Sequence, residues 1–202
     1  MIHVVITTPD KCREGTRAVS MVARSIITEY PSMVVGPSEN VPGYPACYTS
    51  IVLLFDAEPA EISRARHNWE GIVLFRSHGN PYTGDDNAVS DWRVNVAFID
   101  SGQAPELDPA SIEMVYYESR HSLGEHENLK TAVRAIHRPT GITVDCDQAP
   151  SAFHNSMMAW SLLRLKVLPA VGTYRGTPES GGCPVGAYHG TPAPLRIIEG
   201  TL

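Results

Sequence analysis

The stretch "AVRAIHRPTGITVDC", residues 132–146, decides the fold of this chain because it predicts a β-hairpin. Apolar and polar residues alternate on both sides of a turn, as expected of half-buried strands over Val133–His137 and Ile142–Cys146. Between the two strands, Pro139 stands early in the turn and Gly141 late, as a type I turn prefers. We therefore expect two antiparallel strands here, around which a small domain is built.

The hairpin is flanked by elements that complete this domain. Ile112 to Glu118 is apolar and β-branched enough for a strand. Ser151 can cap a helix that ends near Leu168. We expect a hairpin-plus-helix domain over residues 110–168. Six apolar residues of the helix are interpreted as core rather than as a ligand site, on one side Phe153, Met157 and Trp160 and on another Met158, Leu162 and Leu165.

Residues 1–103 show alternating strand and helix patterns, which predict an α/β layer domain. Two stretches, 35–48 and 77–91, are rich in Pro, Gly and polar residues and predict loops. Residues 103–109 read as a linker. The expected strands are Ile2–Thr7, Ser50–Phe55, Ile72–Phe75 and Trp92–Ile99, and the expected helices are Asp10–Tyr30 and Glu58–Asn68.

Composition restricts the class of protein. The 202 residues carry a formal net charge of −6, and only three of them are lysines. Because proteins that bind nucleic acid neutralise many phosphates with cations, we expect weak nucleic-acid binding or none. There is no apolar run of 18 residues and no basic leader, so no membrane partner and a cytoplasmic location are expected. The four cysteines and eight histidines form no ligand pattern, so we expect no metal and no cofactor.

The hairpin sequence resembles a segment of a known family. "AVRAIHRPTG", residues 132–141, is similar to the segment after the GGQ motif in class I peptide-chain release factors. "ELDPASIEMVYYESR" (106–120) resembles the strand before that motif, and "GITVDCDQAPSAFHNSMMAWSLLRLK" (141–166) the hairpin and helix after it. "NWEGIVLF" (68–75) is similar to the short branch named release factor homologue H, a suspected ribosome-rescue hydrolase. The resemblance spans residues 2–168 and implies an α+β, release-factor-like fold.

The resemblance also shows where the chain departs from the family. The GGQ-equivalent positions hold Leu123, Gly124 and Glu125, while His126 and Asn128 match the family's following His and Asn. A GGQ loop needs glycines for its tight backbone and donors near a developing oxyanion. Leu123 adds bulk and Glu125 adds a negative charge, so we expect no active catalytic residue. The alternative is that Glu125 acts as a general base.

The regions that face rRNA in the family have lost charge as well. After the hairpin, the resemblance leaves only Ser151 and Asn155 as remnants of a binding motif, with Pro150 and Ser156 where the family carries Arg and Lys. A region that is basic in homologue H holds three acids here, Asp85, Asp86 and Asp91.

Two functional hypotheses from different classes follow. The first is a catalytically degenerate pseudoenzyme that serves as a non-hydrolytic binding or structural component of a larger protein assembly, for instance a virion. The alternative is a ribosome-associated peptide-release or ribosome-rescue factor that acts on peptidyl-tRNA. A different enzyme on the same scaffold is a third possibility. Salt-dependent ribosome binding separates the first two.

Residues 169–202 form a Gly/Pro-rich tail rather than a domain. Its run "GGCPVG" (181–186) favours a turn over a nucleophilic site at Cys183. We expect residues 171–202 to act as an arm that docks on other protein chains, because "PLRIIEGTL" (194–202) could add as a strand to a sheet edge. The alternative is that the tail covers its own domain.

Overall fold

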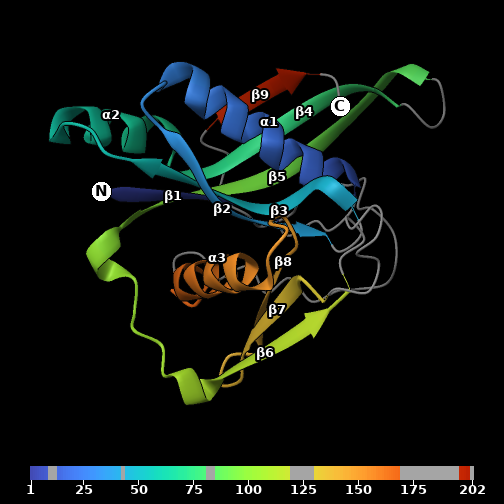
Figure 1. The fold of residues 1–202 in the computed structure, drawn as a ribbon. Coiled ribbons are helices and arrows are strands. Elements are labelled where there is room, and N and C mark those ends of the chain that lie inside the picture. The colour runs from blue at the N-terminus through green and yellow to red at the C-terminus, as the bar shows by residue number, and fades with distance from the viewer. Residues whose placement is uncertain (9–12, 42–43, 81–84, 119–129, 169–195, 201–202) are drawn as a thin grey trace.

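The computed structural model describes residues 1–8, 13–41, 44–80, 85–118, 130–168 and 196–200 (Figure 1). Two sheets and three α-helices make up this part of the chain. Two short 3₁₀ helices, Ser101–Gln103 and Pro109–Ser111, lie between the fifth and sixth strands. In chain order the elements are β1 (Ile2–Thr7), α1 (Arg13–Glu29), β2 (Val34–Val41), β3 (Tyr44–Phe55), α2 (Pro59–Trp69), β4 (Gly71–Asn80), β5 (Asp85–Asp100), β6 (Ile112–Tyr117), β7 (Ala132–His137), β8 (Ile142–Cys146), α3 (Ala152–Lys166) and β9 (Arg196–Gly200).

The larger sheet has six strands in the order β2-β3-β1-β5-β4-β9. Its pairs are antiparallel except that of β4 with β9. The loop predictions for 35–48 and 77–91 were wrong over most of their length, because β2, β3, β4 and β5 extend through them. The β2–β3 ladder has register shifts, one of them beside Pro37, and an edge strand tolerates proline at such a bulge.

The alternation of β1 divides its side chains between two cores. Val4 and Ile6 face α1 and α2, whereas Val5 faces α3 and the second sheet. Figure 1 shows α1 and α2 above the larger sheet and α3 below it. The larger sheet is therefore the central layer of an α+β fold.

The second sheet has the order β6-β7-β8 and confirms the predicted hairpin. The turn has the bond of a four-residue β-turn, from Thr140 N to His137 O at 3.2 Å, and a second bond from Gly141 N to the same oxygen at 2.8 Å extends it by one residue. Gly141 has a φ of 70°, the left-handed conformation that glycine adopts without strain. Pro139 accordingly lies in the middle of the turn rather than at its start.

Helix α3 begins after Ser151, as predicted, although the Ser151 side chain forms no capping hydrogen bond. Leu162 and Leu165 are buried. The assignment of Phe153 and Met157 to the core was wrong, because their exposed fractions are 68% and 55%. Both lie on the side of α3 that neither sheet covers.

The last described strand comes from the tail. Arg196–Gly200 pairs with β4 of the same chain, so this part of the tail follows the alternative in which it covers its own domain. Residues 169–195 and 201–202, with the rest of the predicted arm, lie outside the described residues.

Candidate functional site

The candidate site is the base of the loop that joins β6 to β7. Leu123, Gly124 and Glu125 belong to this loop, but residues 119–129 lie outside the described residues. The two ends of the loop are described, and Tyr117 at the end of β6 pairs with Ala132 at the start of β7. The geometry given below is therefore that of the residues that hold the two ends of the loop.

Asn155 of α3 is the central group of this support. Its side chain is completely buried. Nδ2 donates to Thr131 O and to Ala149 O, both at 2.8 Å. Oδ1 accepts from the amides of Gln148 at 3.2 Å and Ala149 at 2.9 Å. Two donors and two acceptors use the whole capacity of the amide, so Asn155 holds the entry to β7 against the segment before α3.

The two residues expected to remain from a binding motif, Ser151 and Asn155, thus differ in burial. Asn155 has an internal role here, and none of its polar atoms is available to a ligand. Ser151 is half-buried at the start of α3, where its carbonyl accepts from the Asn155 amide at 3.0 Å. A binding role for Ser151 stays a prediction.

A second brace lies on the opposite face of the small sheet. Tyr117 Oη donates to Asp145 Oδ1 at 3.3 Å, and Arg134 donates to both Asp145 oxygens at 2.8 and 3.3 Å. Burial raises the pKa of Tyr117 well above its usual range, and the Asp145 carboxylate raises it further. Tyr117 therefore stays protonated and is a donor rather than a base. Sequence reasoning missed this brace, although the hairpin register sets Arg134 opposite Asp145.

A buried ion pair joins the larger sheet to α3. Glu39 of β2 is 7% exposed and accepts from Lys166 Nζ of α3. The same carboxylate accepts from Asp145 N at 3.1 Å and Ser50 Oγ at 3.2 Å. Burial by itself raises the pKa of Glu39, but the Lys166 ammonium and the hydrogen bonds from Lys166 and the Asp145 amide outweigh it and lower the pKa. The braces of the loop base are thereby connected to the larger sheet.

The contact between β2 and the segment after β8 continues through hydrogen bonds between Ser38 and Gln148. Gln148 Nε2 donates to Ser38 O at 2.6 Å, and Ser38 Oγ donates to Gln148 Oε1 at 2.7 Å. Cys146 lies beside them, with its sulfur 3.6 Å from Ser38 O. Burial raises the pKa of Cys146 far above its usual range, so its thiol is not a nucleophile.

Most cations of the small sheet and α3 already have partners. Arg138 lies 3.5 Å from Glu113, and Arg164 donates to the carbonyls of Ala104 and Pro105 at 3.1 and 2.8 Å. Arg134 and Lys166 are paired as described above. Within the described part of residues 112–168, Lys130 is the one cation without such a partner.

One of the three acids noted in the sequence is also paired. Asp91 receives two hydrogen bonds from Arg76 across the β4–β5 ladder, at 2.8 and 2.9 Å. Arg76 lowers the pKa of Asp91. Asp91 is thus part of a neutral pair rather than a free charge. The side chains of Asp85 and Asp86 lie outside the described residues.

Among the described residues, no three His, Cys, Asp or Glu side chains gather into a possible metal site. None of the helices described is long and apolar enough to cross a membrane.

Known proteins share part of this chain. No protein-family profile matches it. Peptide chain release factor 1 of Anaeromyxobacter dehalogenans is 41% identical over 92 residues, which are 43% of this chain and 24% of that protein. Peptide chain release factor 1 of Myxococcus xanthus is 44% identical over 63 residues, or 31% of this chain and 17% of that protein. The chain spans a quarter or less of these relatives.

A solved structure shares the fold. RF2 of Thermus thermophilus matches with a TM-score of 0.55 and 21% sequence identity, over 81% of this chain and 47% of that one. At this identity the likeness concerns the fold, and it supports the α+β, release-factor-like architecture described above.

Proposed function

We propose that this chain, a class I release-factor-like protein, uses the release-factor scaffold for binding and does not hydrolyse peptidyl-tRNA. The observation that carries the proposal is the loop sequence. Leu123 and Glu125 stand where the family pattern has Gly and Gln. Leu123 removes the backbone freedom of a glycine, and Glu125 removes the neutral hydrogen-bond donor of a glutamine. The family's chemistry needs both.

The physical consequence of each replacement can be stated. A leucine β-carbon disfavours the left-handed backbone that glycine permits, at a cost of about 1–2 kcal/mol. A carboxylate beside a developing oxyanion raises the energy of the transition state, because hydrogen-bond donors and not anions stabilise that charge. Both effects act against ester hydrolysis, and neither affects the support below the loop.

The electrostatics of the described residues support a non-hydrolytic, protein-directed role. Arg134, Arg138 and Lys166 are each neutralised by a carboxylate within the chain. Their charges are therefore less available for phosphates, whose neutralisation dominates binding to nucleic acid. We infer weak and unspecific binding to rRNA, and other protein chains as the partners.

A peptide-release assay on ribosomes loaded with peptidyl-tRNA tests the proposal. Release by the wild type at saturating protein should equal background, and Glu125→Ala should release no less. Glu127→Gln is a matched control that removes a charge from the same loop. Release well above background that is lost in Glu125→Ala, but kept in Glu127→Gln, would make Glu125 the general base and overturn the proposal.

A ribosome-associated release or rescue factor is the second candidate. It is favoured by the intact support of the loop, since Asn155 and the Arg134–Asp145 pair hold both ends in place. Co-sedimentation with ribosomes separates the candidates. Under our proposal, binding is lost as salt rises from about 50 to about 200 mM. Stoichiometric binding at the higher salt supports the second candidate. The fold and the relatives add nothing in favour of a virion component.

A further inference from the structure

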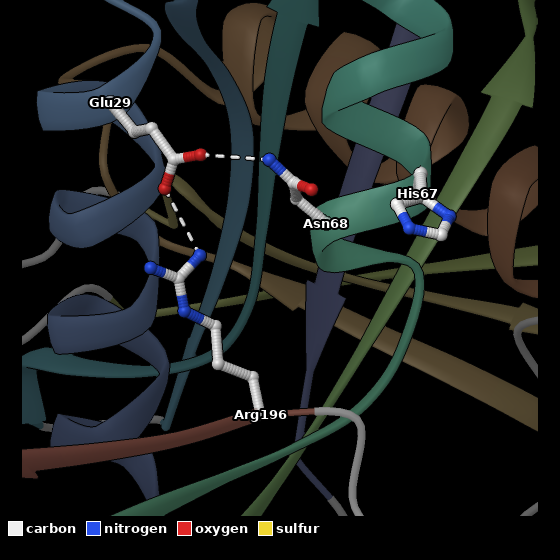
Figure 2. A pocket seen from close by; sticks show the side chains of 4 residues that line it. All are labelled: Glu29, His67, Asn68 and Arg196. Atoms are coloured by element: carbon white, nitrogen blue, oxygen red, sulfur yellow. Dashed lines mark hydrogen bonds and ion pairs between the residues drawn. The ribbon is translucent and has the colours of Figure 1, made fainter.

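The two sheets differ in how their outer strands are protected. An unprotected outer strand recruits strands of other molecules, and proteins prevent this with proline, bulges, charges or a covering segment. In the larger sheet, β2 carries Pro37 beside a register shift, and its Glu39 accepts from the Asp145 amide of β8. At the opposite edge, β9 has only five residues, and Figure 2 shows its Arg196 reaching Glu29 of α1 beside an open pocket. Both edges of the larger sheet are therefore protected.

The outer strand of the small sheet, β6, has none of these features. Among the described residues it pairs with β7 alone, in a register without a shift over Ile112–Tyr117. Its sequence, IEMVYY, contains no proline and a single charge, Glu113, and four of its six residues are of types that favour strands. Within the described part of the chain, β6 is therefore the outer strand most open to another strand.

The hydrogen bonds of the β6–β7 ladder show which backbone groups of β6 face outward. Ser111 O accepts from Arg138 N at 2.9 Å, so these two residues form a hydrogen-bonded pair just before the strand. Such pairs recur at every second residue of an antiparallel ladder, so the odd-numbered residues of β6 bond to β7. The even-numbered residues turn their amides and carbonyls toward the open edge; these are Ile112, Met114 and Tyr116.

Exposed apolar side chains border this edge on the side of α3. Tyr116 is exposed, and its Oη accepts from Ser156 Oγ of α3 at 3.3 Å. Phe153 and Met157 are also exposed, and their spacing from Ser156 places all three on one side of the helix. Aromatic and methionine side chains gathered at one place are typical of protein contacts. The edge thus offers both backbone groups and an apolar surface.

We propose that β6 pairs antiparallel with β6 of a second copy of this chain, about a two-fold axis at Val115. The two strands then satisfy each other's outward backbone groups, which is the self-complementarity that a two-fold interface needs. Met114 of one copy lies opposite Tyr116 of the other, so apolar side chains meet on the α3 side. Glu113 lies opposite Tyr117 of the other copy and far from the other Glu113. An axis at Met114 would instead place the two Glu113 side chains diagonally across the pair, which is less favourable.

The two small sheets become one continuous sheet in this dimer, with both α3 helices on the same face. Phe153 and Met157 of each copy then border the added strand instead of solvent. Nucleic acid fits this edge less well, because its border is apolar and Arg138 beside it is paired with Glu113. The inference does not rest on the proposed function, since neither ester hydrolysis nor ribosome binding enters it.

Val115→Cys tests the register with the full chain. Val115 is exposed, so the substitution should leave the fold intact. The two introduced thiols lie opposite each other in a pair without hydrogen bonds, where Cα atoms approach to about 4.5 Å and a disulfide can form. Val35→Cys is the matched control, because Val35 is an exposed valine on β2 and the native cysteines are the same. After mild oxidation, we expect about tenfold more linked dimer from Val115→Cys than from Val35→Cys.

Sedimentation of the wild type between about 1 and 100 µM is the second measurement, since interfaces of modest size bind in the micromolar range. We expect a dimer fraction that rises with concentration. Tyr116→Lys puts a charge into the apolar row and should lower the association constant about tenfold, whereas Val35→Lys should not change it. The proposal is overturned if the wild type is monomeric at every concentration. It is equally overturned if the dimer persists undiminished in Tyr116→Lys, or if Val115→Cys links no better than Val35→Cys, because the interface then lies elsewhere.

Discussion

The two faces of the six-stranded sheet are covered by different means. Above the sheet, α1 and α2 bury large apolar side chains such as Phe55 and Trp69, which are almost completely inaccessible. Below it, apolar residues of α3 share the interface with buried polar groups, among them Asn155 and the Glu39–Lys166 pair. One sheet therefore supports a mainly apolar layer and a partly polar layer.

The difference shows that one layer mainly stabilises the sheet, whereas the other mainly positions the β6–β7 loop. Apolar contact is non-directional, so the upper layer stabilises the sheet without fixing one exact orientation. Hydrogen bonds depend on distance and angle, so the lower layer fixes where the β6–β7 loop begins and ends. Four variants, from the largest expected effect to the smallest, test this division.

Phe55→Ala should have the largest effect, a loss of about 4 kcal/mol in the free energy of unfolding. Its ring is fully buried in the upper core and packs edge-on against Tyr30 with 5.9 Å between ring centres. Urea denaturation measures the loss. Phe153→Ala is the matched control, since Phe153 is 68% exposed and should cost little. Equal losses in the two variants would contradict the burial difference.

Glu39→Gln should come next, with a loss of about 3 kcal/mol, because it leaves the largely buried Lys166 without a counter-charge. The double variant Glu39→Gln/Lys166→Met should lose less than Glu39→Gln alone. Additive losses, measured by urea denaturation, would show that the two residues do not interact. Glu113→Gln, at an exposed pair, serves as the control.

Glu39 should also give the protein an acid-sensitive component of stability. Its pKa is lower in the folded chain than in the unfolded chain. Its contribution is therefore fully present above the unfolded pKa of about 4.3 and is lost as the pH falls through the folded pKa. Denaturation midpoints measured between about pH 2 and 6 should fall more steeply for the wild type than for Glu39→Gln. Parallel curves would refute this assignment.

Asn155→Ala should cost about 2 kcal/mol and disturb the loop base in particular. The substitution leaves partly buried backbone groups of Thr131 and Ala149 without these partners. Hydrogen exchange should accelerate at the β6–β7 ends and stay unchanged in β1. Ser161→Ala is the control, because its exposed hydroxyl donates to Met157 O within the same helix. Faster exchange throughout the chain would mean that Asn155 acts on global stability only.

Arg138→Ala should have the smallest effect, below about 0.5 kcal/mol. The Arg138 side chain is 63% exposed, and its distance to Glu113 is 3.5 Å. Thermal denaturation with and without added salt should give nearly the same midpoint shift. A loss near that of Glu39→Gln would show that exposure does not weaken ion pairs here.

The sequence predicted those helices and strands that are determined by residues close together in the chain. The strands over Ile2–Thr7 and Val133–His137 follow from alternation, which depends on neighbouring residues. The predicted start of α3 at Ser151 was also right, although the Ser151 side chain makes no capping hydrogen bond there. β2 was missed because "GPSEN" (36–40) has loop composition, and only pairing with β3 makes it a strand.

The site was less predictable, because its interactions join distant parts of the chain. Asn155 matched a surface motif, but its partners include Thr131, 24 residues away, and no local signal reports that contact. The Glu39–Lys166 pair spans 127 residues, beyond any pattern in the sequence. The loop residues Leu123, Gly124 and Glu125 remain predictions from the family pattern.

The pairing of β4 with β9 also bears on the order in which the chain folds as it is made. β4 is complete at Asn80, but the strand that covers its edge begins only at Arg196. At about 5–20 residues per second, a ribosome needs roughly 6–25 s to make the intervening residues. During that interval the nascent sheet has a bare edge, which is the kind of surface that recruits other strands. The β4 edge of the sheet thus stays uncovered until residues 196–200 have been made. In a polysome, a strand of a neighbouring nascent chain can reach this edge during the same interval.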